Sequence, residues 1–154
     1  FQVDKLKEFI GYMKNLNIIG FSVTIPHKVE VMKYLDGIDK QAKGISAVNT
    51  IVVKNDKLIG YNTDCPGAIK ALERRTELKN KNAVVLGAGG AARAMVYGLI
   101  ENKSNVTILN RTVEKAKLLA SYFKCDYGSL NDIKNIDYDI LINTTSAGMH
   151  PKAD

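Results

Sequence analysis

Residues 83–92 read AVVLGAGGAA, an apolar strand pattern that runs directly into a glycine-rich turn. The Ala-rich residues that continue to 102 predict a helix that opens within this turn. Gly87 permits the tight turn, Gly89 lets the backbone approach a ligand, and Ala92 allows close packing of helix against strand. A helix N-terminus also presents free N–H groups and a partial positive charge to phosphates. The stretch therefore predicts a dinucleotide site, lined at its phosphates by Gly87, Ala88, Gly89, Gly90 and Ala91. The alternative is a glycine-rich turn without a ligand.

The end of the next predicted strand, residues 106–109, indicates which dinucleotide binds. An NAD site usually has an acidic residue there, which binds the ribose hydroxyls. This strand is followed instead by Asn110-Arg111-Thr112, without a carboxylate. An arginine can bind a 2′-phosphate through charge-assisted hydrogen bonds, and Asn110 and Thr112 can add neutral ones. The sequence therefore predicts NADP. The alternative is an exposed arginine beside a helix that Thr112 caps.

A third strand end, residues 142–149, reads INTTSAGM. Ligands of open parallel sheets lie beyond the carboxyl ends of the strands. We therefore expect this polar loop to line the nicotinamide ribose, and a plain loop is the alternative. The cofactor residues predicted here are Thr144, Thr145, Ser146 and Met149.

These strand ends belong to a segment in which apolar strands and helices alternate. Such alternation indicates a parallel sheet with helices on both faces. Residues 82–154 are therefore predicted to form a partial NADP-binding domain, a Rossmann-like doubly wound parallel sheet. It offers only three or four strands, whereas a complete dinucleotide domain usually has about six. The expected elements are strands at 83–86, 106–109 and 139–143 and helices at 90–102 and 113–123.

The first part of the chain has a different, mixed α/β pattern, and the fold class of the whole is α/β. Residues 1–64 are predicted to form a partial substrate-binding domain, and residues 65–81 a connecting helix and linker. Asn55-Asp56 is typical of a two-residue hairpin turn, and Asn62-Thr63-Asp64 offers helix-capping side chains. The expected elements are helices at 4–15, from Pro26 to 34 and at 68–78, and strands at 18–25, 47–53 and 58–61.

Composition excludes several classes of function. The chain has 154 residues, 45% of them apolar, and a formal charge of +6. Its lysines are spread without basic runs or interleaved aromatics, which argues against nucleic-acid binding. No apolar run approaches the roughly 20 residues of a membrane helix. Cys65 and Cys125 are too few for a disulfide framework or a zinc site, so we expect two thiols in a reducing compartment and no metal.

Two polar clusters in the first part carry groups suited to proton transfer. One is SVTIPHK, residues 22–28, and the other is GYNTD, residues 60–64; AVNT, residues 47–50, lies between them. Taken singly, each is more typical of turns and caps than of catalysis. Together with the blocks at 87–92, 110–112 and 143–149, they resemble in order the signatures of the shikimate dehydrogenase family. The resemblance covers the chain from about Gly20 onward.

The resemblance implies a reversible, NADPH-dependent reduction of 3-dehydroshikimate to shikimate, in the pathway to aromatic amino acids. It places the family's catalytic residues at Lys28 and Asp64. Lysine can donate or accept the proton at the reacting oxygen, and a neighbouring carboxylate can position it. The hydride chemistry belongs to the cofactor, so no metal is needed. The substrate contacts implied by the resemblance are Ser22, Thr24, Lys28, Asn49 and Asp64.

The chain also departs from the family pattern. Ser22 stands where many members have Asn, and Cys65-Pro66 follows Asp64 where Gly is usual. His27 is expected to be a surface residue. The family's N-terminal serine motif and its C-terminal part are absent, so we expect a fragment of a longer protein. We expect a cytoplasmic enzyme with a small-molecule substrate, and a homodimer is one option for its assembly.

Two other functions remain open at this point. A quinate/shikimate dehydrogenase would have broader substrate or cofactor use. A non-catalytic NADP-binding sensor could be built on the same fold, although a pure binder needs neither Lys28 nor Asp64.

Overall fold

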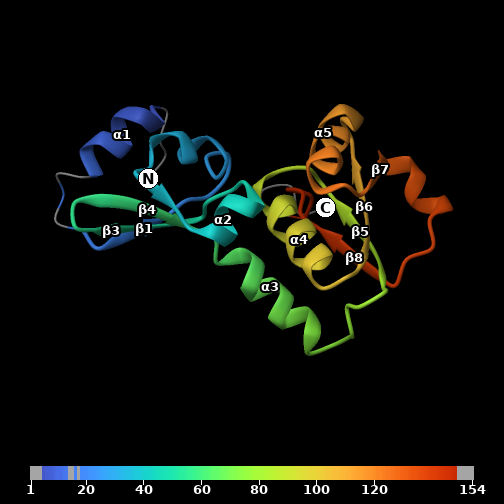
Figure 1. Cartoon of the computed structure of the whole chain (residues 1–154). Helices are drawn as coiled ribbons and strands as arrows, with labels where there is room; N and C mark the ends of the chain where they lie inside the picture. The colour runs from blue at the N-terminus through green and yellow to red at the C-terminus, as the bar shows by residue number, and fades with distance from the viewer. Residues whose placement is uncertain (1–4, 14–15, 17, 149–154) are drawn as a thin grey trace. The chain divides into compact units, whose positions relative to one another are not determined.

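The computed structural model describes residues 5–13, 16 and 18–148, and the chain divides into two compact units (Figure 1). The first unit is Phe1–Asp64 and the second is Cys65–Asp154. Within the described residues, no helix is both long enough and apolar enough to cross a bilayer. Each unit has its own four-stranded sheet.

The first unit contains a four-stranded mixed sheet in the order β1-β3-β4-β2. β3 pairs with β1 and β4 in antiparallel fashion, whereas β2 runs parallel to β4. Asn55 and Asp56 join β3 to β4 with φ values of 49° and 58°. These left-handed values are those of a two-residue hairpin turn, so the predicted hairpin is confirmed. The strands are β1 (Gly20–Ser22), β2 (Gly37–Ile38), β3 (Thr50–Lys54) and β4 (Lys57–Tyr61).

Three short helices complete the described part of the first unit. α1 (Leu6–Met13) confirms the predicted N-terminal helix, and its Leu6 and Ile10 are buried in the hydrophobic core. The 3-10 helix η1 (Glu30–Tyr34) adds Val31 to the same core. α2 (Lys40–Ile45) was not expected from the sequence; its N-terminus is capped by Asp39, whose carboxylate accepts the N–H of Gln41 at 2.9 Å.

Three sequence predictions in this unit are too long or of the wrong type. The predicted strand 18–25 is a strand only over Gly20–Ser22, and the predicted strand 47–53 begins at Thr50. The predicted helix from Pro26 is a turn followed by η1. The physical reason lies in the backbone hydrogen bonds: Val23 N–H donates to Asn49 O at 2.7 Å, and Val48 N–H donates to Lys28 O at 2.8 Å. These bonds tie the flanking segments together outside the regular ladder.

The second unit contains a fully parallel sheet in the order β7-β6-β5-β8. This places the first strand of the unit between its second and fourth, which is the order of a dinucleotide-binding half-sheet. The predicted strands and helices are confirmed, whereas the short polar strand β7 was not expected. The strands are β5 (Asn82–Leu86), β6 (Asn105–Asn110), β7 (Asp126–Ser129) and β8 (Ile140–Asn143).

In the part of the second unit that the structure describes, α-helices cover one face of this sheet. α4 (Gly90–Glu101) and α5 (Val113–Phe123) contact each other and connect strands that step in one direction across the sheet. Right-handed crossovers place both helices on the same face. The return from β7 to β8 crosses the other face and contains only the 3-10 helix η2 (Leu130–Asn135). The predicted helical cover of both faces is therefore only partly present.

α3 (Asp64–Glu73) begins and ends four to five residues earlier than predicted. Asp64 is its first residue, and Pro66 lies in its first turn, where a missing N–H breaks no helical hydrogen bond. Cys65 and Ile69 of α3 pack against Gly98 of α4. A Cβ at Gly98 would lie 2.5 Å from Ile69 Cγ1, so the glycine permits the close approach of the two helices.

Candidate active site

Lys28 and Asp64 form an ion pair in the first unit. Lys28 Nζ donates to Asp64 Oδ2 at 2.7 Å. The lysine side chain is 14% exposed and the carboxylate 35% exposed. Partial burial strengthens the attraction between the two charges relative to bulk water. The pair is thus held in one geometry while the carboxylate stays accessible to a ligand.

Asn49 holds the other oxygen of the same carboxylate. Its Nδ2 donates to Asp64 Oδ1 at 2.7 Å and to Thr63 Oγ1 at 3.0 Å. Its Oδ1 accepts the N–H of Thr63 at 2.9 Å and the hydroxyl of Thr50 at 2.9 Å. Asn49 is only 9% exposed, so its amide is an internal scaffold as well as a candidate substrate contact. The residues predicted from separate motifs are therefore brought together at Asp64.

Thr50 and Thr63 were not predicted as site residues, although both bond to Asn49. Thr63 was expected to offer capping chemistry, and its position beside Asp64 was the one available signal. Thr50 could be identified as a site residue only from the tertiary structure. Asn62, from the same cluster, is 4% exposed and donates to Ala47 O at 2.9 Å. That contact fixes the loop that carries Asn49.

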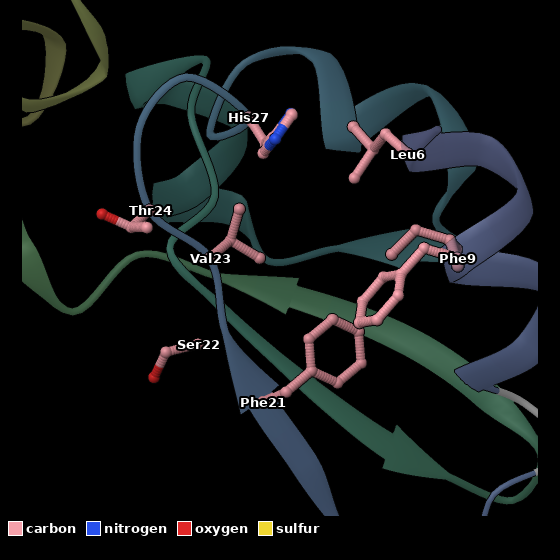
Figure 2. A pocket seen from close by; sticks show the side chains of 8 residues that line it. Leu6, Phe9, Phe21, Ser22, Val23, Thr24 and His27 are labelled. Atoms are coloured by element: carbon pink, nitrogen blue, oxygen red, sulfur yellow. The ribbon is translucent and has the colours of Figure 1, made fainter. Parts of the chain in front are cut away.

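Ser22 and Thr24 are exposed, and neither makes a direct bond to the ion pair within the described residues. Ser22 lies directly opposite Thr50 in the antiparallel pair of β1 and β3, so their side chains share one face of the sheet. The hydroxyl of Thr50 belongs to the Asn49 cluster. Figure 2 shows Ser22 and Thr24 pointing away from the apolar side chains of the same segment. Their placement is compatible with the predicted role in binding substrate.

A mainly apolar pocket of about 130 Å³ lies between α1 and the segment that begins with β1, and Ser22 and Thr24 belong to its lining (Figure 2). Phe9 and Phe21 meet edge to face there, with ring centroids 6.1 Å apart. His27 lines this pocket and is half-buried, which corrects its expected surface position. The reason is that the turn after Pro26 directs the imidazole toward α1 while the adjacent Lys28 faces Asp64.

The glycine turn of the second unit has the geometry of a phosphate site. Gly87 has a φ of 109°, a conformation that L side chains rarely adopt. Gly89 is the N-cap of α4 at a φ of −91°, and a Cβ there would meet nothing within 4 Å. The protein therefore requires glycine at position 87 for its own packing but not at 89, where open space leaves room for a ligand over the helix N-terminus. Ala92 is fully buried, as close helix packing requires.

Charge near this turn is positive. Arg93 lies in the first turn of α4, where burial lowers its pKa below the usual value of an arginine and the nearby Tyr122 opposes that shift. Arg111 lies at the carboxyl end of β6, is exposed, and forms no ion pair with any residue the structure describes. Asn110 donates from Nδ2 to Thr112 O at 2.8 Å, and Thr112 is the N-cap of α5 without a side-chain capping bond. Arg111 thus presents its guanidinium to solvent beside the glycine turn.

The loop after β8 flanks the glycine turn on the other side, because β8 and β6 both pair with β5. Thr144 donates its hydroxyl to Leu86 O at 2.6 Å. Thr145 donates to Asn143 Oδ1 at 2.7 Å and accepts from Ala147 N–H at 3.1 Å. Both hydroxyls are thus used inside the protein. Ser146 is part of this loop, and Met149 lies outside the described residues.

Neither cysteine contributes a reactive group to this site. Cys65 is buried in α3. Burial, reinforced by the charge of Asp126, raises the pKa of Cys125 to about 11. Its thiol therefore stays protonated at neutral pH. Among the residues that the structure describes, no three histidine, cysteine or acidic side chains gather as a metal site would require.

Two family models match the chain. The first, described as the shikimate dehydrogenase substrate binding domain, matches residues 1–51. The second, described as shikimate / quinate 5-dehydrogenase, matches residues 70–150. The second match alone covers more than half of the chain.

Individual relatives agree with the family models. A shikimate dehydrogenase (NADP(+)) of Methanococcus maripaludis strain C6 is 48% identical, with 98% of this chain and 57% of that protein covered. The crystal structure of shikimate dehydrogenase from Aquifex aeolicus has a TM-score of 0.89 at 38% identity, and 99% of this chain covers 57% of that one. The shikimate 5-dehydrogenase of Thermus thermophilus, solved with NADP(H) and shikimate, has a TM-score of 0.85 at 33% identity, with 97% and 56% covered. The chain thus spans just over half the length of these relatives.

Proposed function

This chain belongs to the shikimate / quinate 5-dehydrogenase family, and we propose that the protein catalyses the reversible NADPH-dependent reduction of 3-dehydroshikimate to shikimate. The observation that carries this proposal is the ion pair of Lys28 and Asp64, held at 2.7 Å and braced by Asn49. A protein that only bound NADP would need no such proton-transfer pair. The glycine turn, Arg111 and the names of the relatives support NADP as the cofactor.

In the proposed reaction, Lys28 moves the proton at the reacting oxygen. When the carbonyl carbon of 3-dehydroshikimate gains a hydride, its oxygen becomes an alkoxide and takes a proton from the Lys28 ammonium. In the reverse direction, Lys28 accepts the hydroxyl proton of shikimate. When bound, NADPH would supply the hydride in the reduction and NADP+ would accept it in the reverse reaction. A positioned acid–base group of this kind typically contributes about 10²–10⁴ in rate.

Asp64 and Asn49 are proposed to orient both Lys28 and the substrate. Asp64 Oδ2 accepts the N–H of Lys28, which fixes the direction of the ammonium. The carboxylate is more exposed than the lysine, so it can also accept a substrate hydroxyl. Ser22, Thr24 and Asn49 are proposed as further contacts with substrate hydroxyls. Their hydroxyl and amide groups can match the several alcohols of a polyhydroxylated ring.

The second unit is proposed to bind NADP at three strand ends. The N–H groups at the start of α4 would bind the pyrophosphate, since, beyond its neighbours in the chain, no residue that the structure describes lies within 4 Å of a Cβ placed on Gly89. Arg111, with Asn110 and Thr112, would bind the 2′-phosphate. The loop after β8, with Thr145 and Ser146, would lie toward the nicotinamide ribose. The remaining cofactor residues proposed from the turn are Gly87, Ala88, Gly90 and Ala91.

We also propose a cytoplasmic location for this activity. Cys65 and Cys125 form no disulfide, as is usual for proteins of reducing compartments.

A four-way assay of the intact protein tests the proposed function. Shikimate and quinate are each offered with NADP and with NAD, and formation of reduced nicotinamide is followed. We expect rapid turnover with shikimate and NADP and much slower turnover in the other three mixtures. Equal or faster oxidation of quinate would instead support the broader quinate/shikimate activity, and no oxidation of shikimate with NADP would contradict the proposal.

A further inference from the structure

The peptide that joins Leu86 to Gly87 is held from both sides at the point where β5 ends. Its N–H, on Gly87, donates to Leu109 O of β6 at 2.8 Å. Its carbonyl, on Leu86, accepts two bonds from Thr144: one from the backbone N–H at 2.9 Å and one from Oγ1 at 2.6 Å. Three hydrogen bonds from two neighbouring segments therefore fix the orientation of this one peptide.

The Thr144 hydroxyl also occupies the space that glycine leaves at position 87. A Cβ on Gly87 would lie 2.6 Å from Thr144 Oγ1 and 3.3 Å from Thr145 Cγ2. The φ of 109° at Gly87 directs the chain into the turn that ends at Gly89, the N-cap of α4. The hydroxyl and the glycine are thus complementary in shape at the start of the turn that leads to α4.

The neighbouring threonine has a different set of bonds. Thr145 directs its hydroxyl to Asn143 and receives the N–H of Ala147, so its contacts stay within the loop after β8. Thr144 instead reaches across to β5. Its hydroxyl proton is committed to a backbone carbonyl, which makes it unsuited to donate to a bound cofactor at the same time.

We propose that Thr144 is a positioning residue for dinucleotide binding, and that its hydroxyl acts through the Leu86–Gly87 peptide rather than on the cofactor. The inference rests on the proposed function and deepens it. The peptide leads into the N–H groups proposed for the pyrophosphate, which NADP and NAD share. Thr144 therefore sets the affinity for both dinucleotides, whereas Arg111 sets the preference between them.

The test measures dissociation constants for NADP and NAD on the intact protein with Thr144→Val and Thr144→Ser. Valine keeps the branched shape but loses the hydroxyl, and serine keeps the hydroxyl. We expect Thr144→Val to bind both dinucleotides about tenfold more weakly, which corresponds to about 1.4 kcal/mol. We expect Thr144→Ser to stay within about threefold of the unaltered protein, since it retains the hydrogen bond. The ratio of the two affinities should not change in either variant.

Thr76→Val is the matched control, because Thr76 also donates its hydroxyl to a backbone carbonyl, Glu77 O at 3.2 Å, but away from the turn. It should leave both affinities unchanged. The thermal unfolding midpoint of each variant is measured as well, and affinities are compared only between variants that are folded. Unchanged binding in folded Thr144→Val, equal losses in the valine and serine variants, or a loss confined to NADP would overturn the proposal. If the unaltered protein bound neither dinucleotide, the proposed function itself would fail, and this inference with it.

Discussion

Arg111 is the residue that we propose selects NADP over NAD. It is exposed at the end of β6, and the described part of the chain offers it no acidic partner. Hydrogen bonds to a charged group are worth about 1.5–3 kcal/mol each, so Arg111→Leu should weaken NADP binding by roughly 10- to 150-fold. NAD, which lacks the 2′-phosphate, should bind almost as before.

The matched control for that change is Arg75→Leu, which removes the same charge from another exposed position of the second unit. Both variants are measured by titrating NADP and NAD at one fixed salt concentration, since surface charge effects depend on salt. Equal weakening of NADP and NAD by Arg111→Leu would remove the argument for a 2′-phosphate contact.

The carboxylate of Asp139 should make the stability of the folded protein depend on pH. Its carboxylate accepts the N–H of Asn82 at 2.9 Å and the ammonium of Lys81 at 3.0 Å. The Asn82 hydrogen bond, followed by that from Lys81, lowers the pKa of Asp139 below its usual 3.8. A lowered pKa in the folded state stabilises the protein above pH 3.8, and this stabilisation is lost as the pH falls through the folded-state pKa.

Asp139→Asn should therefore lower the thermal midpoint at pH 7, and the difference from the unaltered protein should shrink as the pH falls below about 4. Asp137→Asn, a nearby exposed carboxylate, is the control and should show a smaller effect. A destabilisation by Asp139→Asn that stayed constant from pH 7 down to acid would contradict the electrostatic account.

The sequence predicted the polar residues of the site better than their supporting partners. Lys28, Asn49 and Asp64 could be named because the polar clusters that carry them resemble, in order, the signatures of the shikimate dehydrogenase family, whereas each cluster alone indicates only turns and caps. Thr50 could not, since its bond to Asn49 depends on how β3 leaves the loop. His27 was misplaced because its burial depends on α1, which lies far away along the chain. Local pattern carries no information about such packing.

At the scale of elements, the packing of α3 on α4 depends on Gly98. Added volume at Gly98 must displace Ile69 or Cys65, which a Cβ would meet at 2.5 Å and 3.0 Å. Overpacking of this kind typically costs about 1–3 kcal/mol. Gly98→Ala should therefore lower the free energy of unfolding by about that amount in a denaturant titration.

Gly98→Ala combined with Ile69→Val should recover part of the loss, because removing one methyl group makes room for the new one. Gly67→Ala is the control, since a Cβ at Gly67, in the same helix α3, would meet nothing within 4 Å. Equal stability of Gly98→Ala and the unaltered protein would show that α3 does not pack as closely as described.

Element type was predictable where periodicity was strong. The sequence predicted the main strands and helices of the second unit from alternating apolar segments and the glycine-rich turn between β5 and α4. It predicted the β3–β4 hairpin from Asn55-Asp56. The first unit was harder, because apolar residues continue past the ends of β1 and β3 while the backbone bonds pair with other segments. β7 reads DYGS and has no apolar pattern; only its pairing with β6 makes it a strand.

At the scale of the whole molecule, the two units carry separate parts of the proposed reaction. The first unit holds the ion pair and its Asn49 brace, and the second holds the glycine turn and Arg111. Asp64 is at once the last residue of the first unit and the first residue of α3. The chain spans about 57% of the length of a curated relative such as that of Methanococcus maripaludis strain C6.

The central claim is that Lys28 transfers the proton while NADP exchanges hydride with the substrate. The most direct measurement is kcat for shikimate oxidation with saturating NADP, compared between the unaltered protein and Lys28→Ala. Lys33→Ala, an exposed lysine of η1, serves as the control and should turn over normally. We expect Lys28→Ala to lower kcat by about 10²–10⁴ with a smaller change in KM, as loss of a general acid–base predicts. Near-normal turnover by Lys28→Ala would contradict the account.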